Sequence, residues 1–122
     1  MTAASQPVLA LCRRADLDAT GAKEAIVEID GARHSVVVFK DGAAIRAYVN
    51  SCPHARLPLN WDGDRFFDLS GTYLLCFNHG AAFDMRTGLC VRGPAKGRSL
   101  SPVPVRLEND WIVTDVAAWP GT

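Results

Sequence analysis

Short apolar runs separated by turn-forming residues cover most of this chain. The runs are rich in Val, Ile, Phe and Tyr, and Gly, Asp, Asn and Pro lie between them. This pattern is typical of strands joined by turns. It predicts strands over residues 8–13, 23–29, 33–39, 44–49, 72–76, 82–84, 89–92, 103–107 and 111–114. Many short strands of this kind indicate an all-β protein whose antiparallel sheets form a sandwich or a barrel.

Turn-forming residues also predict how the strands connect. Residues that tolerate positive φ and favour tight hairpins lie between alternating runs, in Asp30-Gly31, Asp41-Gly42 and Glu108-Asn109-Asp110. The first half of the chain is therefore expected to form a meander. Residues 15–17 are compatible with one helical turn, but no segment has a sustained helical periodicity, so helix content should be low.

The length and composition favour one small globular domain over residues 1–122. Hydrophobic residues make up 48% and charged residues 21%, which excludes disordered and fibrous designs. Thirteen basic and thirteen acidic residues give no net charge, which disfavours a nucleic-acid partner. The apolar run at residues 8–11 is too short for a membrane span, and no basic leader precedes it. We therefore expect a cytoplasmic protein that does not bind membranes.

Two segments carry the chemistry, Cys52-Pro53-His54 and Cys76-Phe77-Asn78-His79-Gly80, and each offers one thiolate and one imidazole. Without an export signal, four cysteines in a small chain favour metal binding over disulfides. An iron-sulfur cluster held by two Cys and two His needs this set of ligands. Two tight loops could hold such a cluster between them, with a Pro stiffening the first loop and a Gly allowing the second to turn.

The order of these segments resembles the Rieske family. Its pattern is Cys-x-His, a spacer, Cys-x-x-His-Gly, an apolar strand, a Gly and a Gly-Pro loop, which residues 81–84, Thr87-Gly88 and Gly93-Pro94 continue here. The resemblance covers nearly the whole chain. It implies three antiparallel sheets, with a cluster-binding subdomain inserted in the second half. It also implies one 2Fe-2S cluster per chain, held by loops at about 51–61, 76–81 and 93–98.

The resemblance assigns a role to each ligand position. Cys52 and Cys76 would bind the inner iron, His54 and His79 would bind the outer, partly exposed iron, and Pro94 would cover the cluster. Backbone amides of the ligand loops would donate hydrogen bonds to the bridging sulfides. The chain departs from the family pattern in a long spacer of 21 residues, 55–75, and in Asn78, where a Trp is often found.

Respiratory-chain Rieske subunits resemble this chain but have four additional features that it lacks. They place a Cys in each ligand loop, where Leu57 and Asn78 stand here, so the bracing disulfide cannot form. They also place a Ser and a Tyr hydroxyl near the cluster, where Ala81 and Phe83 stand here. The resemblance therefore implies a potential at the low end of the Rieske range, about −150 mV.

Other interpretations of the same residues remain open. Two Cys and two His also suit tetrahedral zinc, although structural zinc sites usually pair Cys with Cys at short spacing. His34 has no Cys nearby and is read as an ordinary strand residue. Cys12 and Cys90 lie in apolar strands and are expected to be buried, although a disulfide between them is not excluded. Trp61, Trp111 and Trp119 are read as packing residues.

The sequence favours a soluble one-electron carrier rather than an enzyme. Stand-alone Rieske proteins of this size resemble the ferredoxins of multicomponent oxygenases, which pass electrons from a flavin-dependent reductase to a terminal oxygenase. The alternatives are a small subunit of a larger redox enzyme such as nitrite reductase, and a redox-sensing interaction module. Basic side chains in or near the distal loops could meet an acidic partner: Arg56, Arg86, Arg92, Lys96 and Arg98.

Overall fold

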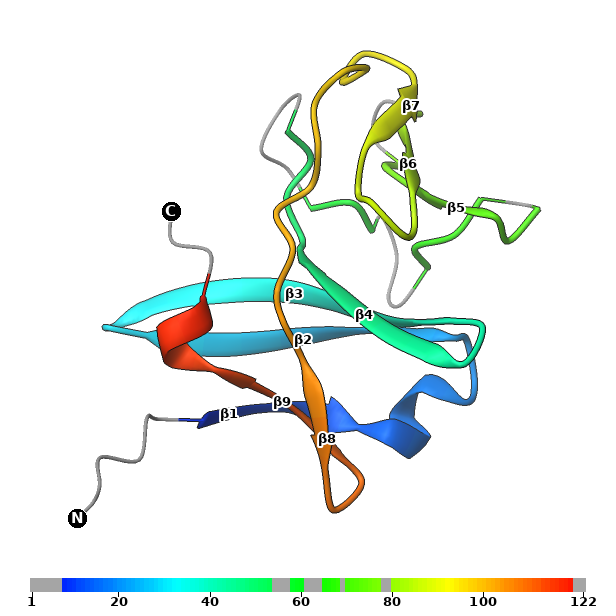
Figure 1. The fold of residues 1–122 in the computed structure, drawn as a ribbon. Coiled ribbons are helices and arrows are strands. Elements are labelled where there is room, and N and C mark those ends of the chain that lie inside the picture. The colour runs from blue at the N-terminus through cyan, green and yellow to red at the C-terminus, as the bar shows by residue number, and fades with distance from the viewer. Residues whose placement is uncertain (1–7, 54–57, 61–64, 69, 78–79, 120–122) are drawn as a thin grey trace.

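The computed structural model describes residues 8–53, 58–60, 65–68, 70–77 and 80–119. Their strands form three antiparallel sheets of three strands each (Figure 1). One sheet has the order β2 (Ala22–Ile29), β3 (Ala32–Asp41) and β4 (Ala44–Val49). A second has the order β1 (Val8–Arg13), β9 (Trp111–Asp115) and β8 (Arg106–Glu108). The third has the order β5 (Tyr73–Leu75), β6 (Ala82–Asp84) and β7 (Cys90–Arg92).

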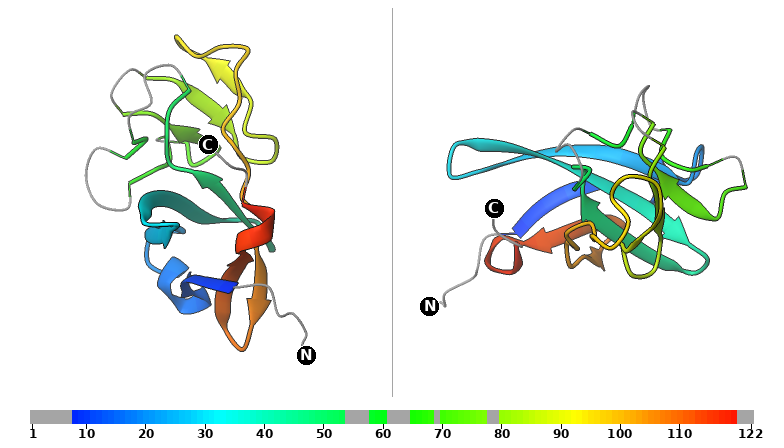
Figure 2. Two further views of the ribbon diagram at one scale, coloured as in Figure 1. Left: turned by 90° about the vertical axis from the view of Figure 1, so that its left-hand side faces the viewer. Right: turned by 90° about the horizontal axis from the view of Figure 1, so that it is seen from above.

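The first two sheets together are called the base, and the described part of residues 50–101, which contains the third sheet, is called the inserted subdomain. The inserted subdomain leaves the base after β4 and returns before β8, and it extends from one end of the base (Figures 1 and 2). This arrangement confirms the predicted all-β fold of three sheets. The described residues contain no α-helix, and none of their helical segments is long and apolar enough to cross a membrane.

Strand β3 is buried on both faces and separates two hydrophobic cores. Val36 and Val38 pack into the core of the base, whereas Val37 and Phe39 pack into a core shared with the inserted subdomain. All four side chains are fully buried. Successive side chains of a strand point to opposite faces, so a continuous apolar run is what a strand between two cores requires.

The predicted turns are present. Asp30 and Gly31 both have positive φ, 52° and 81°, as do Asn109 and Asp110, at 50° and 71°. Two consecutive residues with positive φ make the turn whose twist matches the paired strands, and Asn, Asp and Gly are the residues that tolerate it. The helical turn expected at residues 15–17 is a 3-10 turn, η1 (Arg14–Leu17), and a second, η2 (Val116–Ala118), was not predicted.

One predicted strand is wrong in its extent. The strand expected over 103–107 begins only at Arg106, since Pro102 and Pro104 have no backbone N–H to contribute to a ladder. The segment between them crosses the edge of β4, where the Val103 N–H donates to the Ala47 carbonyl at 2.9 Å. Strand β1 pairs with β9 rather than with its neighbour in sequence, so the meander is limited to β2, β3 and β4.

Candidate metal site

Two of the predicted ligands, Cys52 and Cys76, are completely buried and belong to the same hydrophobic core. Cys52 lies three residues after β4, and Cys76 directly follows β5. The other two predicted ligands, His54 and His79, lie outside the described residues. No disulfide joins the four cysteines, all of which the structure describes.

The loop after Cys76 is closed by backbone hydrogen bonds. The Cys76 N–H donates to the Ala81 carbonyl and the Gly80 N–H donates to the Cys76 carbonyl, both at 2.8 Å. Gly80 has a φ of 76°, which a residue with a side chain rarely adopts. The loop therefore turns back within five residues and leads into β6, which pairs antiparallel with β5.

The spacer packs against both cysteine loops. The Leu59 N–H donates to Asn50 Oδ1 at 2.8 Å, two residues before Cys52. The Leu59 carbonyl accepts a hydrogen bond from the Phe77 N–H at 3.0 Å, one residue after Cys76. Leu59 is itself fully buried in the same core as the two thiols. One residue of the spacer thus fixes the two loops relative to each other.

The third predicted loop, at 93–98, contacts both of the others. A Cβ on Gly93 would lie 2.8 Å from Ala81 Cα, so the two backbones touch, and Gly93 has a φ of 98°. The Arg98 guanidinium donates to the Pro53 carbonyl at 3.1 Å. Ala95 is buried in the shared core, whereas Pro94 is exposed. The structure therefore brings described residues of all three predicted loops together.

This environment fits a cluster with thiolate ligands. Two buried cysteine side chains at adjacent loops supply the soft donors that iron prefers in such sites. Among the described residues no three metal-binding side chains lie together, and the two predicted histidine ligands are not among those residues. The donor types of the Cys-x-His and Cys-x-x-His-Gly segments are those of a 2Fe-2S cluster with two His ligands.

The remaining cysteines are buried, as predicted, but in different places. Cys12 lies in the core of the base, and Cys90 lies in the core that holds Cys52 and Cys76. The Cys90 thiol contacts the Arg92 carbonyl at 3.1 Å as a hydrogen-bond donor. Both behave as small buried side chains.

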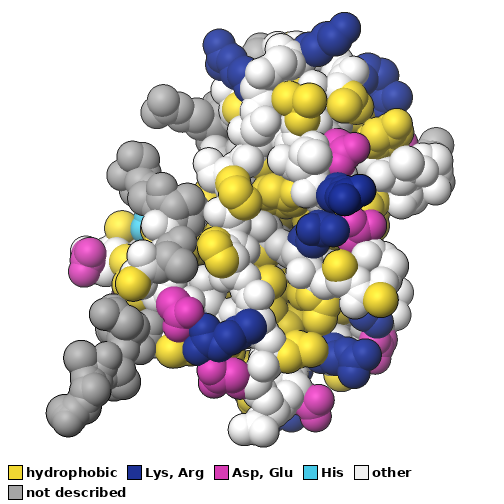
Figure 3. Space-filling view, in the orientation of Figure 1, with side chains coloured by type: hydrophobic (Ala, Val, Ile, Leu, Met, Phe, Trp, Pro, Cys, Tyr) yellow, Lys and Arg dark blue, Asp and Glu magenta, His cyan; other side chains and the backbone are white. Residues whose placement is uncertain are grey.

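The second half of the inserted subdomain is rich in basic residues. Between residues 80 and 98 the chain has one acidic residue, Asp84, and four basic ones, Arg86, Arg92, Lys96 and Arg98. The backbone N–H groups of Thr87 and Arg86 donate to the Asp84 carboxylate and lower its pKa. Lysine and arginine side chains gather at this end of the molecule, with apolar side chains between them (Figure 3). In the same stretch of sequence, Leu89 and Val91 have exposed apolar side chains.

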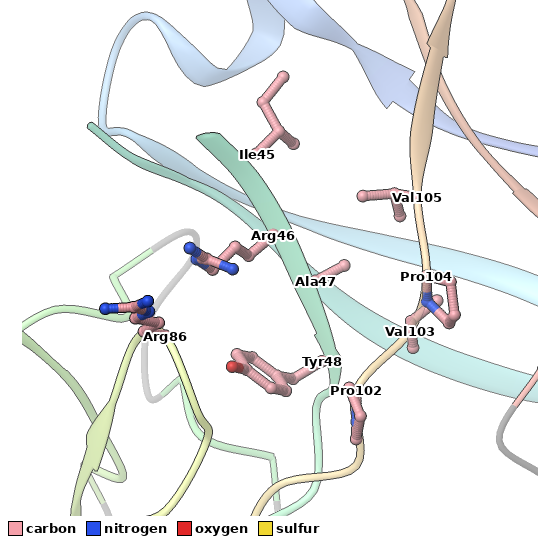
Figure 4. A pocket seen from close by; sticks show the side chains of 9 residues that line it. All are labelled: Ile45, Arg46, Ala47, Tyr48, Arg86, Pro102, Val103, Pro104 and Val105. Carbon is pink, nitrogen blue, oxygen red and sulfur yellow. The ribbon is translucent and has the colours of Figure 1, made fainter. Parts of the chain in front are cut away.

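A cavity of about 230 Å³ lies beside Tyr48 and not at the cysteine loops (Figure 4). It is lined by apolar side chains of β4 and of the segment before β8, with the guanidinium groups of Arg46 and Arg86 on one side. The Tyr48 hydroxyl donates to the Met85 carbonyl at 2.9 Å and so joins the base to the inserted subdomain.

Sequence reasoning did not find Asn50, Arg98 or Tyr48 as residues that position the loops. Each has a sequence context that fits an ordinary residue: an Asn at a strand end, a basic residue in a loop and a Tyr within a strand. Their roles depend on partners far along the chain, which local patterns do not reveal.

Comparison with known proteins identifies the domain type. The family model described as the Rieske 2Fe-2S domain matches residues 8–117. No curated protein sequence matches the chain.

Three solved structures with low sequence identity have a similar fold. A chain in a complex of reduced oxygenase and oxidized ferredoxin of carbazole 1,9a-dioxygenase is 22% identical, with 91% of this chain and 94% of that chain covered and a TM-score of 0.68. The ferredoxin of carbazole 1,9a-dioxygenase from Nocardioides aromaticivorans IC177 is 22% identical, with 88% of this chain and 96% of that chain covered and a TM-score of 0.67. A protein assigned as an NADPH nitrite reductase small subunit is 18% identical, with 88% of this chain and 97% of that chain covered and a TM-score of 0.61.

Proposed function

The chain belongs to the Rieske 2Fe-2S family, and from that premise we propose that it is a one-electron carrier whose cluster is held by Cys52, His54, Cys76 and His79. When bound, the cluster accepts and donates one electron at a time. The chain's own residues position this group and keep water from the inner ligands. The observation that carries the proposal is the burial of Cys52 and Cys76 in one core, at two loops that Leu59 joins.

The two cysteines and the two histidines would have different surroundings. The cysteine side chains are completely buried, so the thiolates would bind the iron that is farther from solvent. Ala95 of the third loop is buried in the same core as the two cysteines, and the neighbouring Pro94 is exposed. Residues 1–122 would act as one unit, with the base serving as the support for three converging loops.

We propose that the redox partners are a flavin-dependent reductase and a terminal oxygenase. Two of the similar structures are a complex of oxygenase and ferredoxin and a ferredoxin of a dioxygenase, which supports this partner class. Arg92, Lys96 and Arg98 are exposed basic residues in or directly before the third loop, and Leu89 and Val91 are exposed apolar residues directly before and within β7, the strand that leads into it. Transient redox partners use small interfaces, and opposite charge speeds their encounter.

Reconstitution of electron transfer tests this function. The purified chain should accept electrons from a flavin-dependent ferredoxin reductase and pass them to a Rieske oxygenase, with a rate that falls as salt is added. Arg92→Glu and Lys96→Glu should slow the transfer, whereas Arg33→Glu, at the exposed start of β3 in the base, should not. Transfer that is insensitive to both salt and the first two changes would contradict the basic docking surface.

The fold is also similar to that of a nitrite reductase small subunit. The alternative function, a permanent subunit of a larger redox enzyme, can be tested with the same proteins. A permanent subunit should elute with its enzyme during size-exclusion chromatography, because lasting interfaces are large and apolar. A carrier should elute alone and still accept electrons.

A further inference from the structure

A polar network joins the base to both cysteine loops, and Glu24 is at its centre. Glu24 lies on β2, on the face that also contributes the buried Ala22 to the shared core. Its Oε2 accepts a hydrogen bond from the Ser35 hydroxyl at 2.6 Å, and its Oε1 accepts one from the Asn60 amide at 3.0 Å. The carboxylate is half-buried, where hydrogen bonds to a charged acceptor are strong.

The second member, Asn50, has almost no access to solvent, with an exposed fraction of 4%. Its Oδ1 accepts the Leu59 N–H, so its Nδ2 faces the other side. There it lies 2.9 Å from Asn60 Oδ1, 3.1 Å from Ser35 Oγ and 3.4 Å from Glu24 Oε2. Two hydrogens serve these three acceptors, so the longest contact is a shared one.

The donors and acceptors of the network fix the orientation of the Asn50 and Asn60 side-chain amides. A carboxylate accepts only, and the side chains of Ser35, Asn50 and Asn60 all donate to Glu24. Asn60 uses its nitrogen on Glu24 and its oxygen on Asn50, so neither amide can turn over without placing two donors together. The charge on Glu24 therefore sets the orientation of both asparagines.

The network ends at the cysteine loops. Asn50 precedes Cys52 by two residues, and its backbone N–H donates to the Ser35 carbonyl at 2.9 Å. Through its side chain it holds Leu59, whose carbonyl accepts the Phe77 N–H next to Cys76. Glu24, Asn50 and Leu59 form one hydrogen-bonded path from the base sheet to both loops.

We infer that Glu24 is a positioning residue for the cluster, acting through Asn50 and Asn60 to set the separation of the two ligand loops. This inference rests on the proposed function, because it concerns the site at which the cluster would be held. It assigns a cofactor-related role to a strand glutamate whose sequence context is that of an ordinary solvent-facing residue.

Glu24→Gln is the test variant, because it keeps the shape and replaces one acceptor oxygen by a donor. Glu28→Gln is the matched control, with the same change of charge on the same face of the same strand, at an exposed position. Glu24→Gln should release iron to a chelator roughly tenfold faster, as expected for loss of a charge-assisted bond. Its midpoint potential should also shift, and Glu28→Gln should match the wild-type chain in both measurements.

A rescue variant separates the network from simple destabilisation. Asn60→Asp alone would place two carboxylates together and should release iron at least as fast as Glu24→Gln. Combined with Glu24→Gln, it exchanges the charged and the amide partner, again pairs a donor with an acceptor between positions 24 and 60, and keeps the net charge. The double variant should recover most of the wild-type iron retention and potential, a coupling that unrelated defects would not produce.

Hydrogen-deuterium exchange supplies a readout that needs no cluster. In Glu24→Gln, peptides containing Leu59 and Phe77 should exchange roughly tenfold faster, whereas peptides from β9, in the other sheet of the base, should not change. If the wild-type chain proves to lack iron, the proposed function fails, and this exchange still decides whether Glu24 holds the loops. For a chain that contains iron, the inference is overturned if Glu24→Gln matches Glu28→Gln, if only one of exchange and iron release changes, or if the double variant is no better than its parents.

Discussion

The base and the inserted subdomain are built from the same kind of element but are held together differently. In the base, β2 has eight residues and β3 has ten, and they pair without a break from Ala22↔Phe39 to Ile29↔Ala32. In the inserted subdomain, β5, β6 and β7 have three residues each. Ladders this short provide few backbone bonds, so the inserted subdomain depends on specific side chains and on close backbone contacts.

This difference explains how a small domain can hold a demanding site. Long ladders with alternating apolar residues tolerate many substitutions of similar size. The loops depend instead on one acceptor in Asn50, one backbone approach at Gly93 and two buried thiols. Apart from Glu24, substitutions in the base should therefore change stability gradually, whereas substitutions at these loop positions should change the site directly.

The largest effect is expected at the cysteine ligands. Cys52→Ser and Cys76→Ser should each leave the chain without its cluster, because one iron loses a thiolate. Cys90→Ser is the matched control, since Cys90 is buried in the same core, with an exposed fraction of 2%. His54→Ala and His79→Ala should also remove the Rieske spectrum. The measurement is iron content together with visible absorbance, and cluster loss in Cys90→Ser would show that the ligand set is incomplete.

A large effect on stability is expected at the contact between the third loop and the second. Gly93→Ala places a Cβ about 2.8 Å from Ala81 Cα at positive φ, and should cost about 3 kcal/mol or more of unfolding free energy. Gly97→Ala has a similar φ, 91°, with nothing within 4 Å of its Cβ, and should cost only about 1–2 kcal/mol. Urea unfolding followed by cluster absorbance measures both, and equal losses would mean that the close approach is unimportant.

A smaller effect, on potential, is expected at β6. Ala81 and Phe83 are fully buried at the turn into β6 and within it. Adding hydroxyls with Ala81→Ser and Phe83→Tyr should raise the midpoint potential by roughly 60 mV, a tenfold change in the one-electron equilibrium. Hydrogen bonds to cluster sulfur favour the added negative charge. Voltammetry of a correctly folded double variant with an unchanged potential would contradict this role.

The hydrogen bond between the two regions should contribute about 1 kcal/mol. Tyr48→Phe removes the bond to the Met85 carbonyl, whereas Tyr73→Phe keeps the ring over which the Arg92 guanidinium lies. The control should retain its unfolding midpoint in urea, and Tyr48→Phe should lower it. A midpoint that Tyr48→Phe leaves unchanged would mean that this contact does not join the two regions.

The same hydroxyl predicts a dependence on alkaline pH. Burial raises the pKa of the Tyr48 phenol, with Arg46 opposing the shift. Its contribution is complete below the usual tyrosine pKa of about 10 and is lost as pH rises through the higher folded pKa. Tyr48→Phe should make stability less sensitive to pH in this alkaline window, and an unchanged pH profile would contradict the assignment.

The sequence predicted the base better than it predicted the site. Residues 36–39 are an uninterrupted apolar run, and Asp30-Gly31 is a local turn signal. Both features could be found from neighbouring residues. The pairing of β1 with β9 joins the two ends of the chain, and apolar alternation does not specify partners at that distance. Pro102 and Pro104 then displaced the start of β8.

At the site, the spacing of cysteine and histidine predicted the cluster ligands. It did not predict the residues that hold the ligand loops in place. Asn50 and Glu24 act through partners up to 36 residues away, and each has an ordinary local context. The positions of His54, His79, Leu57 and Asn78 lie outside the described residues, so their roles stay predictions. The predicted ligand set therefore has to be tested by metal and sulfide analysis of the protein.

The iron and acid-labile sulfide content of the purified wild-type chain tests the central claim most directly. A Rieske cluster held by Cys52, His54, Cys76 and His79 predicts about two irons and two sulfides per chain, in equal amounts. Stoichiometric zinc without sulfide would contradict it, because the same four side chains would then form a tetrahedral site that cannot transfer electrons.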